Sequence, residues 1–458
     1  MDTNSRSRIK SDWPTSLNLS YKPTIPTNGL RVFSQNITTL TSLTCSNVVC
    51  INDTDLFFIA DYFPLLEELD LHSPKKLENY ESLRNGLKAL SSTLFKLRKI
   101  NLTGHHYITD QSLFQLFKNW KLLEEAVIFC CDQITNSGIA IALCERPTLR
   151  SLSFSYLKPA DSATFPALVS NCPSLSEISL ESRRRNIVNY NPFVVCPQLK
   201  SLCLAKSYGL SEESIKILVS LFPNLQLLDL SYCRKAMLSA LPKLRKINLS
   251  GYSGINNLLL LQLCNNCEFL EDIVMLKCPF LTPHGIASAI GQRPTLRGYL
   301  TCLDLVLSHI SDELLTSIAM GGLPLRKLVL TKCFGYSYAG IFSLLSKCQC
   351  IQHLGLRKAH FLSDLHIVKL SLFLADLVSI NISDCEKLTD STLFTLVWKC
   401  RSLSDIKMEY TSVRENIVEN SNSLMNFVMN HRLKSLYLAH SSLLTDESII
   451  MVLCYIWT

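Results

Sequence analysis

The sequence predicts an α/β solenoid, a chain of strand-and-helix repeats in which each repeat packs only on its neighbours. The pattern L-x-x-L-x-L, with other apolar residues allowed at its later positions, starts sixteen times between Leu40 and Leu433. Nine of the fifteen spacings are 26 residues, and the others run from 19 to 31. Helix-start signals and prolines recur at fixed offsets from these starts. A strand and a helix of this length cannot bury their apolar faces alone, so neighbouring repeats must cover them.

Length and composition agree with a repeat architecture. A chain of 458 residues is too long for one ordinary core, whereas a solenoid has no such limit. Apolar residues make up 47% of the chain and charged residues 18%, which is far from a disordered composition. The net charge of +7 is spread along the chain and does not by itself indicate nucleic acid.

Each repeat begins with a short strand and continues into a helix. In the repeat from Leu377, Leu377, Ile380 and Ile382 are spaced for one face of a strand. Thr389 or Asp390 can cap the helix that follows. Proline often precedes the next strand, where it stops the helix. The predicted repeats start at residues 40, 66, 97, 123, 149, 175, 199, 225, 244, 270, 300, 325, 351, 377, 403 and 433.

The two ends and a few repeats depart from this plan. Residues 1–39 carry three prolines among Ser, Thr and Asn, and are expected to be extended or disordered without a strand-and-helix unit. The solenoid is expected to span 40–458, with its last repeat incomplete because the apolar tail is followed by no strand. The 19-residue repeat from Leu225 leaves room only for a turn, and Arg183–Arg185 stand where a helix should be. Longer connections are expected from 66 to 97 and from 403 to 433.

A cysteine follows several of the strands at a fixed offset, as Cys233, Cys333 and Cys385. Cys172 and Cys196 each precede a proline just before a strand. With these features residues 40–458 resemble the cysteine-containing leucine-rich repeats of F-box/LRR proteins and their ribonuclease-inhibitor-like relatives. The resemblance implies a curved horseshoe of about 16 repeats, with an inner parallel sheet and outer helices.

The resemblance also implies a function. Proteins with such repeats are commonly substrate receptors of SCF-type ubiquitin ligases, in which an F-box holds a Skp1-type adaptor and cullin while the repeats hold the target. Residues 1–39 show no F-box pattern, so adaptor and cullin are expected only if an F-box lies upstream. The sequence leaves three hypotheses open: the target-binding part of such a ligase in ubiquitin-dependent degradation, an adaptor, scaffold or decoy without a ubiquitin link, and, less favoured by the mixed charges, a small-ligand receptor.

No motif for catalysis, metal or cofactor stands out. Cys264 and Cys267, with Cys278 beyond, have the spacing of half a zinc site, yet Cys267 and Cys278 fall on cysteine positions of the repeat itself. His105 and His106 are expected to be a solvated polar pair near the rim. We therefore expect a non-enzymatic protein with no metal and no cofactor.

The inner face is the expected binding surface. In L-x-x-L-x-L the leucines point into the core and the x positions line the inner sheet. At the two x positions between the first two leucines, nine basic and eight acidic residues alternate along the curve, which favours a protein partner over nucleic acid. The candidate partner-binding residues are Lys99, Asn101, Glu125, Lys246, Asn248, Asp272, Lys327, His353, Arg357, Ser379, Asn381, Lys407 and Tyr437.

The setting follows from the cysteines and the start of the chain. The first residues hold no apolar signal-peptide core and no apolar run reaches the length of a membrane span, so the nineteen cysteines are expected to be reduced thiols. An intracellular monomer of the cytoplasm or nucleus is expected, with no membrane partner.

Overall fold

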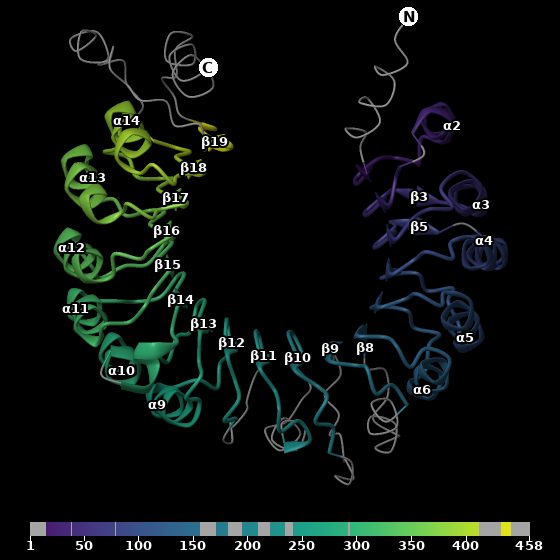
Figure 1. The fold of residues 1–458 in the computed structure, drawn as a ribbon, viewed down its shortest axis with the longest axis horizontal. Coiled ribbons are helices and arrows are strands. Elements are labelled where there is room, and N and C mark those ends of the chain that lie inside the picture. Colours follow the sequence, from purple (N-terminus) through teal and green to yellow (C-terminus); the bar gives the residue numbers. More distant parts are fainter. Residues whose placement is uncertain are drawn as a thin grey trace, which may run out of the picture. The chain divides into compact units, whose positions relative to one another are not determined.

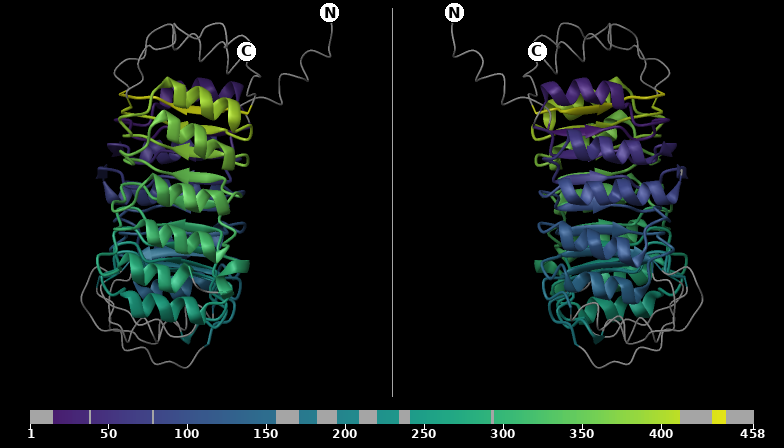
Figure 2. Two further views of the ribbon diagram at one scale, coloured as in Figure 1. Left: turned by 90° about the vertical axis from the view of Figure 1, so that its left-hand side faces the viewer. Right: turned by 90° about the vertical axis from the view of Figure 1, so that its right-hand side faces the viewer.

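The computed structural model describes residues 15–37, 39–77, 79–155, 171–181, 195–208, 220–233, 241–291, 294–411 and 432–440. Contacts divide the chain into two compact units, the N-terminal unit Met1–Leu225 and the C-terminal unit Gln226–Thr458. In both units short parallel strands alternate with helices, and the helices lie along one side of the sheet (Figures 1 and 2). The predicted leucine-rich repeat solenoid is confirmed.

The sheet of the N-terminal unit consists of strands that pair in parallel in chain order. These strands are β1 (Ser16–Asn18), β2 (Ser42–Thr44), β4 (Glu68–Asp70), β6 (Lys99–Asn101), β7 (Glu125–Ile128), β8 (Ser151–Ser155), β9 (Glu177–Glu181) and β10 (Ser201–Cys203). A separate two-stranded sheet pairs β3 (Cys50–Ile51) with β5 (Lys76–Leu77). The helices are α2 (Thr27–Asn36), α3 (Asp53–Tyr62), α4 (Tyr80–Thr93), α5 (Asp110–Asn119) and α6 (Asn136–Cys144).

The C-terminal unit repeats this plan, again with each strand parallel to the next along the chain. Its strands are β11 (Leu227–Asp229), β12 (Lys246–Asn248), β13 (Asp272–Val274), β14 (Cys302–Asp304), β15 (Lys327–Val329), β16 (His353–Gly355), β17 (Ser379–Asn381), β18 (Asp405–Lys407) and β19 (Ser435–Tyr437). Its α-helices are α9 (Asn257–Asn266), α10 (Pro283–Ile286), α11 (Asp312–Gly321), α12 (Tyr338–Lys347), α13 (Asp364–Leu370) and α14 (Asp390–Lys399). Three further turns of helix are η2 (Ala287–Gly291), η3 (Pro294–Gly298) and η4 (Ser371–Phe373).

All sixteen predicted start residues are buried, and a strand begins two residues after each of them. The helices bury the apolar face that their sequence spacing predicts: in α5, Leu113, Leu116 and Phe117 lie inside at the i, i+3, i+4 spacing. The core therefore runs between sheet and helices as a row of stacked leucines, and the strand positions between those leucines face the other way.

The expectation of an extended N-terminal segment is wrong for residues 15–37. β1 pairs in register with β2, Leu17 opposite Leu43, and α2 follows it. The signal was present, because Leu17-x-Leu19 lies 26 residues before Leu43-x-Cys45. It was missed because Pro14 stands where the other repeats begin with an apolar residue.

The turn after each strand has one constant feature. The residue seven positions after each repeat start has a positive φ in every repeat whose turn is described. Only Gly104 and Gly251 are glycines there, although a non-glycine residue in this region costs on the order of 1 kcal/mol. Examples are Lys332 at 58° and Tyr410 at 54°. Because the geometry recurs with so many residue types, the packing of neighbouring repeats must enforce it.

Neighbouring helices are joined at their N-termini by side chains. Thr109 caps α5 and Thr135 caps α6, while Asp110, the first residue of α5, accepts from the Thr135 N–H at 2.7 Å and from its hydroxyl at 2.7 Å. A Cβ atom at Gly138 would lie 2.0 Å from Asp110 Oδ1, so this position needs glycine. We call these aspartate contacts between successive caps the cap seam.

The C-terminal unit repeats the cap seam. Asp312 accepts from the N–H and hydroxyl of Ser337, at 2.7 and 2.6 Å, and a Cβ atom at Gly340 would lie 2.3 Å from Asp312 Oδ1. In α14 the two capping alternatives are resolved, because Thr389 is the N-cap and accepts from the Ser391 N–H. The same scaffold device therefore recurs in both units.

The irregular repeats are only partly described. The added length between Leu66 and Leu97 holds β5 and α4 rather than a connection alone. The predicted loop at Arg183–Arg185, most of the turn after Cys233, the connection before Leu433 and the apolar C-terminal tail lie outside the described residues. No helix among the described residues is long and apolar enough to cross a membrane.

Candidate functional site

The three-residue strands of both units present their first and third side chains to the inner face and the second to the core. Strand β6 shows the pattern, with Lys99 exposed, Ile100 buried and Asn101 half-buried. The alternation follows from the strand period of two, and it confirms that the x positions of the sequence pattern line this face. Each unit has a hollow on this face.

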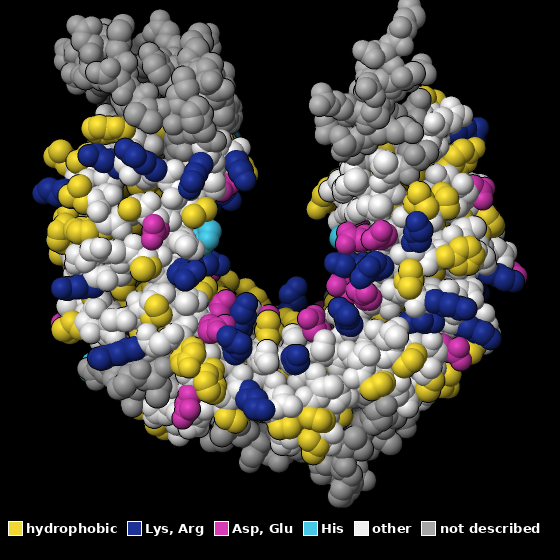
Figure 3. Space-filling view, viewed as in Figure 1, with side chains coloured by type: hydrophobic (Ala, Val, Ile, Leu, Met, Phe, Trp, Pro, Cys, Tyr) yellow, Lys and Arg dark blue, Asp and Glu magenta, His cyan; other side chains and the backbone are white. Residues whose placement is uncertain are grey.

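The N-terminal hollow has a volume of about 240 Å³ and lies over β2, β4, β6 and β7. Its polar lining residues are Ser42, Thr44, Glu68, Asp70, Lys99, Asn101 and Glu125. They include three carboxylates and one ammonium group, so the lining is acidic. In Figure 3 acidic and basic side chains lie side by side on the inner edge of these strands.

The charges of the N-terminal hollow are paired within the chain. Lys99 Nζ lies 3.3 Å from a carboxylate oxygen of Glu68 and 3.5 Å from one of Glu125. The Glu125 charge and the hydrogen bond that Lys99 donates to Glu68 raise the Lys99 pKa above its ordinary value. Beside it, Arg98 and Glu124 pair at 2.6 Å. In this unit, the basic residues of one repeat thus form ion pairs with the acidic residues of the neighbouring repeats.

The C-terminal hollow is larger, about 420 Å³, and lies over β15 to β18. Its polar lining residues are Lys327, Thr331, His353, Ser379, Asn381, Asp405 and Lys407. They hold two ammonium groups and one carboxylate, the reverse of the N-terminal hollow. Gly355 opens the middle of the hollow, since most repeats have a larger side chain at this strand position.

The lysines of the C-terminal hollow are not paired as Lys99 is. Neither Lys327 nor Lys407 forms an ion pair within 4.0 Å with any other residue that the structure describes. Lys407 Nζ lies 5.0 Å from the ring centre of Tyr437, a cation–π distance. His353 Nδ1 and Ser379 Oγ are 2.7 Å apart. The surface of this hollow is therefore rich in hydrogen-bond donors.

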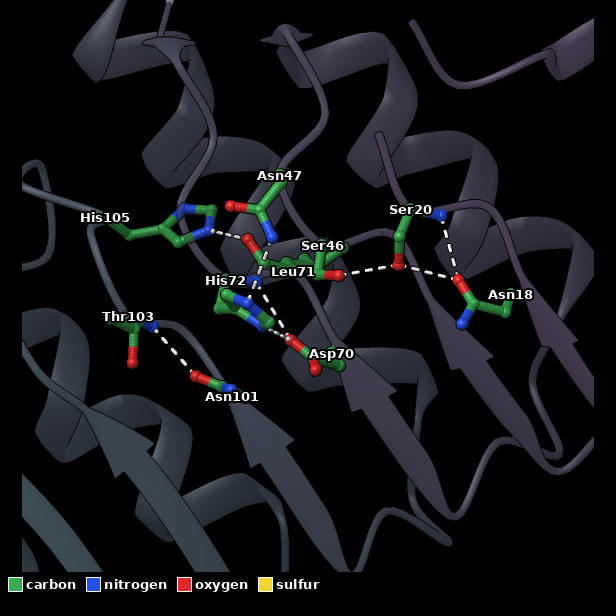
Figure 4. Close-up of polar contacts among 10 residues, drawn as sticks. All are labelled: Asn18, Ser20, Ser46, Asn47, Asp70, Leu71, His72, Asn101, Thr103 and His105. Carbon is green, nitrogen blue, oxygen red and sulfur yellow. Dashed lines mark hydrogen bonds and ion pairs between the residues drawn. The ribbon is translucent and has the colours of Figure 1, made fainter. Parts of the chain in front are cut away.

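Asn101 and Asn381 on the inner face each use the oxygen of the side-chain amide within the chain. Asn101 Oδ1 accepts from the Thr103 N–H at 3.2 Å, and Asn381 Oδ1 accepts from Ser383 N–H at 3.1 Å. Figure 4 shows this Asx turn at Asn101 and the related one at Asp70. Because the oxygen is used to end the strand, the amide NH₂ group is what such an asparagine offers to a partner.

The candidate residues thus fall into three groups. Lys327, His353, Ser379, Asn381 and Lys407 meet at the C-terminal hollow, with Tyr437 beside Lys407. Lys99, Asn101 and Glu125 meet at the N-terminal hollow. The remaining candidates, which line neither hollow, are Lys246, Asn248, Asp272 and Arg357.

Two of that remaining group have partners of their own. Arg357 is paired with Asp384, and Asn248 Nδ2 donates to Asp229 at 3.0 Å. Sequence reasoning missed Gly355, whose sequence signal is a glycine at a strand position that most repeats fill with a larger residue.

The interpretation of His105 as a solvated residue is wrong. His105 is fully buried, its Nε2 lies 2.8 Å from the Leu71 carbonyl oxygen, and burial lowers its pKa to about 4. It stands eight residues after its repeat start, the position of Cys131, whose thiol donates to the Leu102 carbonyl at 3.3 Å. His105 therefore replaces the repeat's cysteine as a donor to the preceding repeat (Figure 4). Counting from Leu97 would have shown this.

The cysteines after the strands are packing residues, as predicted. Cys278 and Cys385 donate to the carbonyls of Leu249 and Leu356, at 3.2 and 3.4 Å. Burial raises the pKa of Cys385 to about 12 and that of Cys278 to about 11, which keeps both as thiols. Among the described residues no group of three or more His, Cys, Asp or Glu side chains is placed to hold a metal ion.

Comparison with known proteins adds likeness of fold. No protein-family model and no curated protein sequence matches the chain. Among solved structures, yeast Rad7 in complex with Elc1 is similar over 73% of this chain and 78% of the other, with a TM-score of 0.42 and 17% identity. Mouse RP105 in complex with MD-1 is similar over 90% of this chain and 77% of the other, with a TM-score of 0.41 and 15% identity. The class that the repeats and the parallel sheets define is the leucine-rich repeat solenoid.

Proposed function

We propose that this chain is a non-catalytic recognition solenoid that binds another protein on the inner face of its C-terminal unit. The observation that carries the proposal is the C-terminal hollow, where two lysines, a histidine, a serine and an amide surround an opening of about 420 Å³. Side chains of mixed polarity beside an exposed aromatic residue, Tyr437, suit a protein surface.

The finer proposal is that the repeats hold the target of an F-box-type ubiquitin ligase. It is supported by the resemblance of the repeats to those of F-box/LRR proteins, including the cysteine that follows the strands. An adaptor, scaffold or decoy without a ubiquitin link is the second candidate. It needs only the binding surface described above.

The proposal places the protein inside the cell, as a monomer. Cys131, Cys278 and Cys385 act as S–H donors between repeats, which requires the reduced thiol. The mixed charge of the inner face is the reason that the proposal does not include nucleic acid.

A blocking substitution tests the binding surface. Ser379→Trp would fill the C-terminal hollow, and Ser151→Trp adds the same side chain at the equivalent strand position in the N-terminal unit, outside either hollow. The tagged full chain and both variants are expressed in cells, cross-linked and purified, and the recovered proteins are quantified by mass spectrometry. We expect partners that Ser151→Trp retains and Ser379→Trp loses. Equal recovery by both variants would remove the hollow from the proposal.

The same purification separates the two finer candidates. Recovery of a Skp1-type adaptor and a cullin with the target supports the ligase subunit. Recovery of hollow-dependent targets without adaptor and cullin supports the adaptor or decoy. Thermal melting of each variant excludes loss of the fold as the reason for lost binding.

A further inference from the structure

The hydrogen-bonding inventory of the C-terminal hollow determines what kind of group it can receive. Lys327 and Lys407 supply ammonium donors from opposite ends of the hollow, on β15 and β18. Asn381 offers its amide NH₂, because its oxygen already accepts from Ser383. The single carboxylate of the lining, Asp405, accepts from the hydroxyl of its neighbour Ser404. A group entering the hollow therefore meets mostly donors.

The charged groups near these donors also bear on the kind of group that the hollow receives. Asp304, on the preceding strand, interacts electrostatically with Lys327, and burial raises the pKa of Asp304. It does not line the hollow and forms no ion pair with Lys327 among the described residues. In Figure 3 the side chains on the inner edge of β15 to β19 are mostly basic. An anionic acceptor fits these surroundings, and a cation does not.

The N-terminal hollow provides the comparison, because its lysine forms ion pairs within the chain. There Lys99 is shared between Glu68 and Glu125, and three carboxylates line the wall. A carboxylate entering that hollow would be repelled. Among the described residues the lysines of the C-terminal hollow form no such ion pairs, which leaves both ammonium groups available to an acid of a partner.

We propose that the C-terminal hollow receives an acidic side chain, Asp or Glu, from an exposed segment of the partner protein. The carboxylate lies between Lys327 and Lys407 and accepts from Asn381, while an apolar neighbour of the acid packs on Tyr437, which is 46% exposed. The inference rests on the proposed function and adds the chemistry of the partner. A volume of about 420 Å³ accommodates the acid together with part of an adjacent residue.

Peptide pools test the inference on the purified full chain. Pools of short peptides carry one fixed central residue, Glu, Gln, Lys or phosphoserine, between random positions, and binding is measured at low and at physiological salt. We expect the Glu pool to bind roughly tenfold more tightly than the Gln pool, as for a partly desolvated charge pair. A preference for the Gln or Lys pool overturns the inference, and a preference for phosphoserine over Glu replaces the carboxylate by a phosphate.

Charge reversal locates the effect. Lys327→Glu/Lys407→Glu is expected to abolish the preference for Glu, whereas Arg150→Glu/Lys200→Glu makes the same change of charge outside both hollows and is expected to keep it. Equal loss in both variants would mean that general attraction, and not the hollow, selects acids. If no pool is preferred while Ser379→Trp still loses cellular partners, the proposed function stands and the acid inference fails.

Discussion

The inner faces of the two units share one scaffold and differ in how they use charge. In the N-terminal unit Lys99 lies between Glu68 and Glu125, so its charge is satisfied by neighbouring strands. In the C-terminal unit Lys327 and Lys407 lie across a hollow without a described ion-pair partner. Lys99 stands opposite Glu68 and Glu125, whereas Lys327 stands opposite Cys302 and His353 in the same register. The residues on the neighbouring strands therefore decide whether a lysine is paired within the chain.

The largest expected effect concerns what the two units have in common, the cap seam. Asp110→Ala and Asp312→Ala each remove an acceptor of two hydrogen bonds from the next helix cap. We expect each to lower the free energy of unfolding by about 2 kcal/mol, because charged hydrogen bonds at a helix N-terminus are lost. Urea unfolding of both variants measures this. A loss in one unit only would show that the scaffolds are not equivalent.

The second expected effect is specific to the N-terminal unit and depends on pH. Burial holds the pKa of His105 at about 4, below its ordinary value of 6.5, so protonation favours the unfolded chain. The stabilising contribution is complete above pH 6.5 and is lost as the pH falls towards 4. Between pH 7.5 and pH 5 the loss amounts to roughly 2 kcal/mol.

His105→Cys provides the control for this pH effect, because the next repeat has a cysteine, Cys131, at the same position. Unfolding at both pH values is expected to show that the variant loses about 2 kcal/mol less than the native chain on acidification. An unchanged pH dependence would mean that His105 is not the group responsible.

The smallest expected effect compares the two sets of lysines directly. A double-mutant cycle on Lys99 and Glu125, each changed to Ala, should give a coupling of about 0.5 kcal/mol, as for exposed ion pairs. The same cycle on Lys327 and Asp405 should give a coupling near zero. Unfolding in low and high salt measures the two coupling free energies. Equal values would contradict the claim that the lysine is paired in the N-terminal hollow and unpaired in the C-terminal hollow.

Much of the scaffold could be predicted from the sequence. The sixteen predicted starts fix the register of the strands. Each start residue is buried, and only one alignment of neighbouring strands buries all of them. The first repeat was missed because Pro14 replaces the leading apolar residue. His105 was misinterpreted because a residue type, rather than its position eight residues after Leu97, was taken as the signal.

The site was predictable only in part. The sequence identified the residues of the inner face, including Lys327, His353 and Lys407. It did not show which lysines form ion pairs. Ion pairing depends on which strands are neighbours and on whether the two charged groups come within reach of each other. Nor did the sequence show the hollow at Gly355, which is defined by a side chain that is missing.

The most direct test of the account is a charge exchange between the C-terminal hollow and its ligand. One peptide from the preferred Glu pool is made with Glu and with Lys at its central position, and both are titrated against the native chain and Lys327→Glu/Lys407→Glu. The native chain is predicted to bind the Glu peptide roughly tenfold more tightly, and the variant to prefer the Lys peptide. If the variant ranks the two peptides as the native chain does, the C-terminal hollow is not where the acid binds.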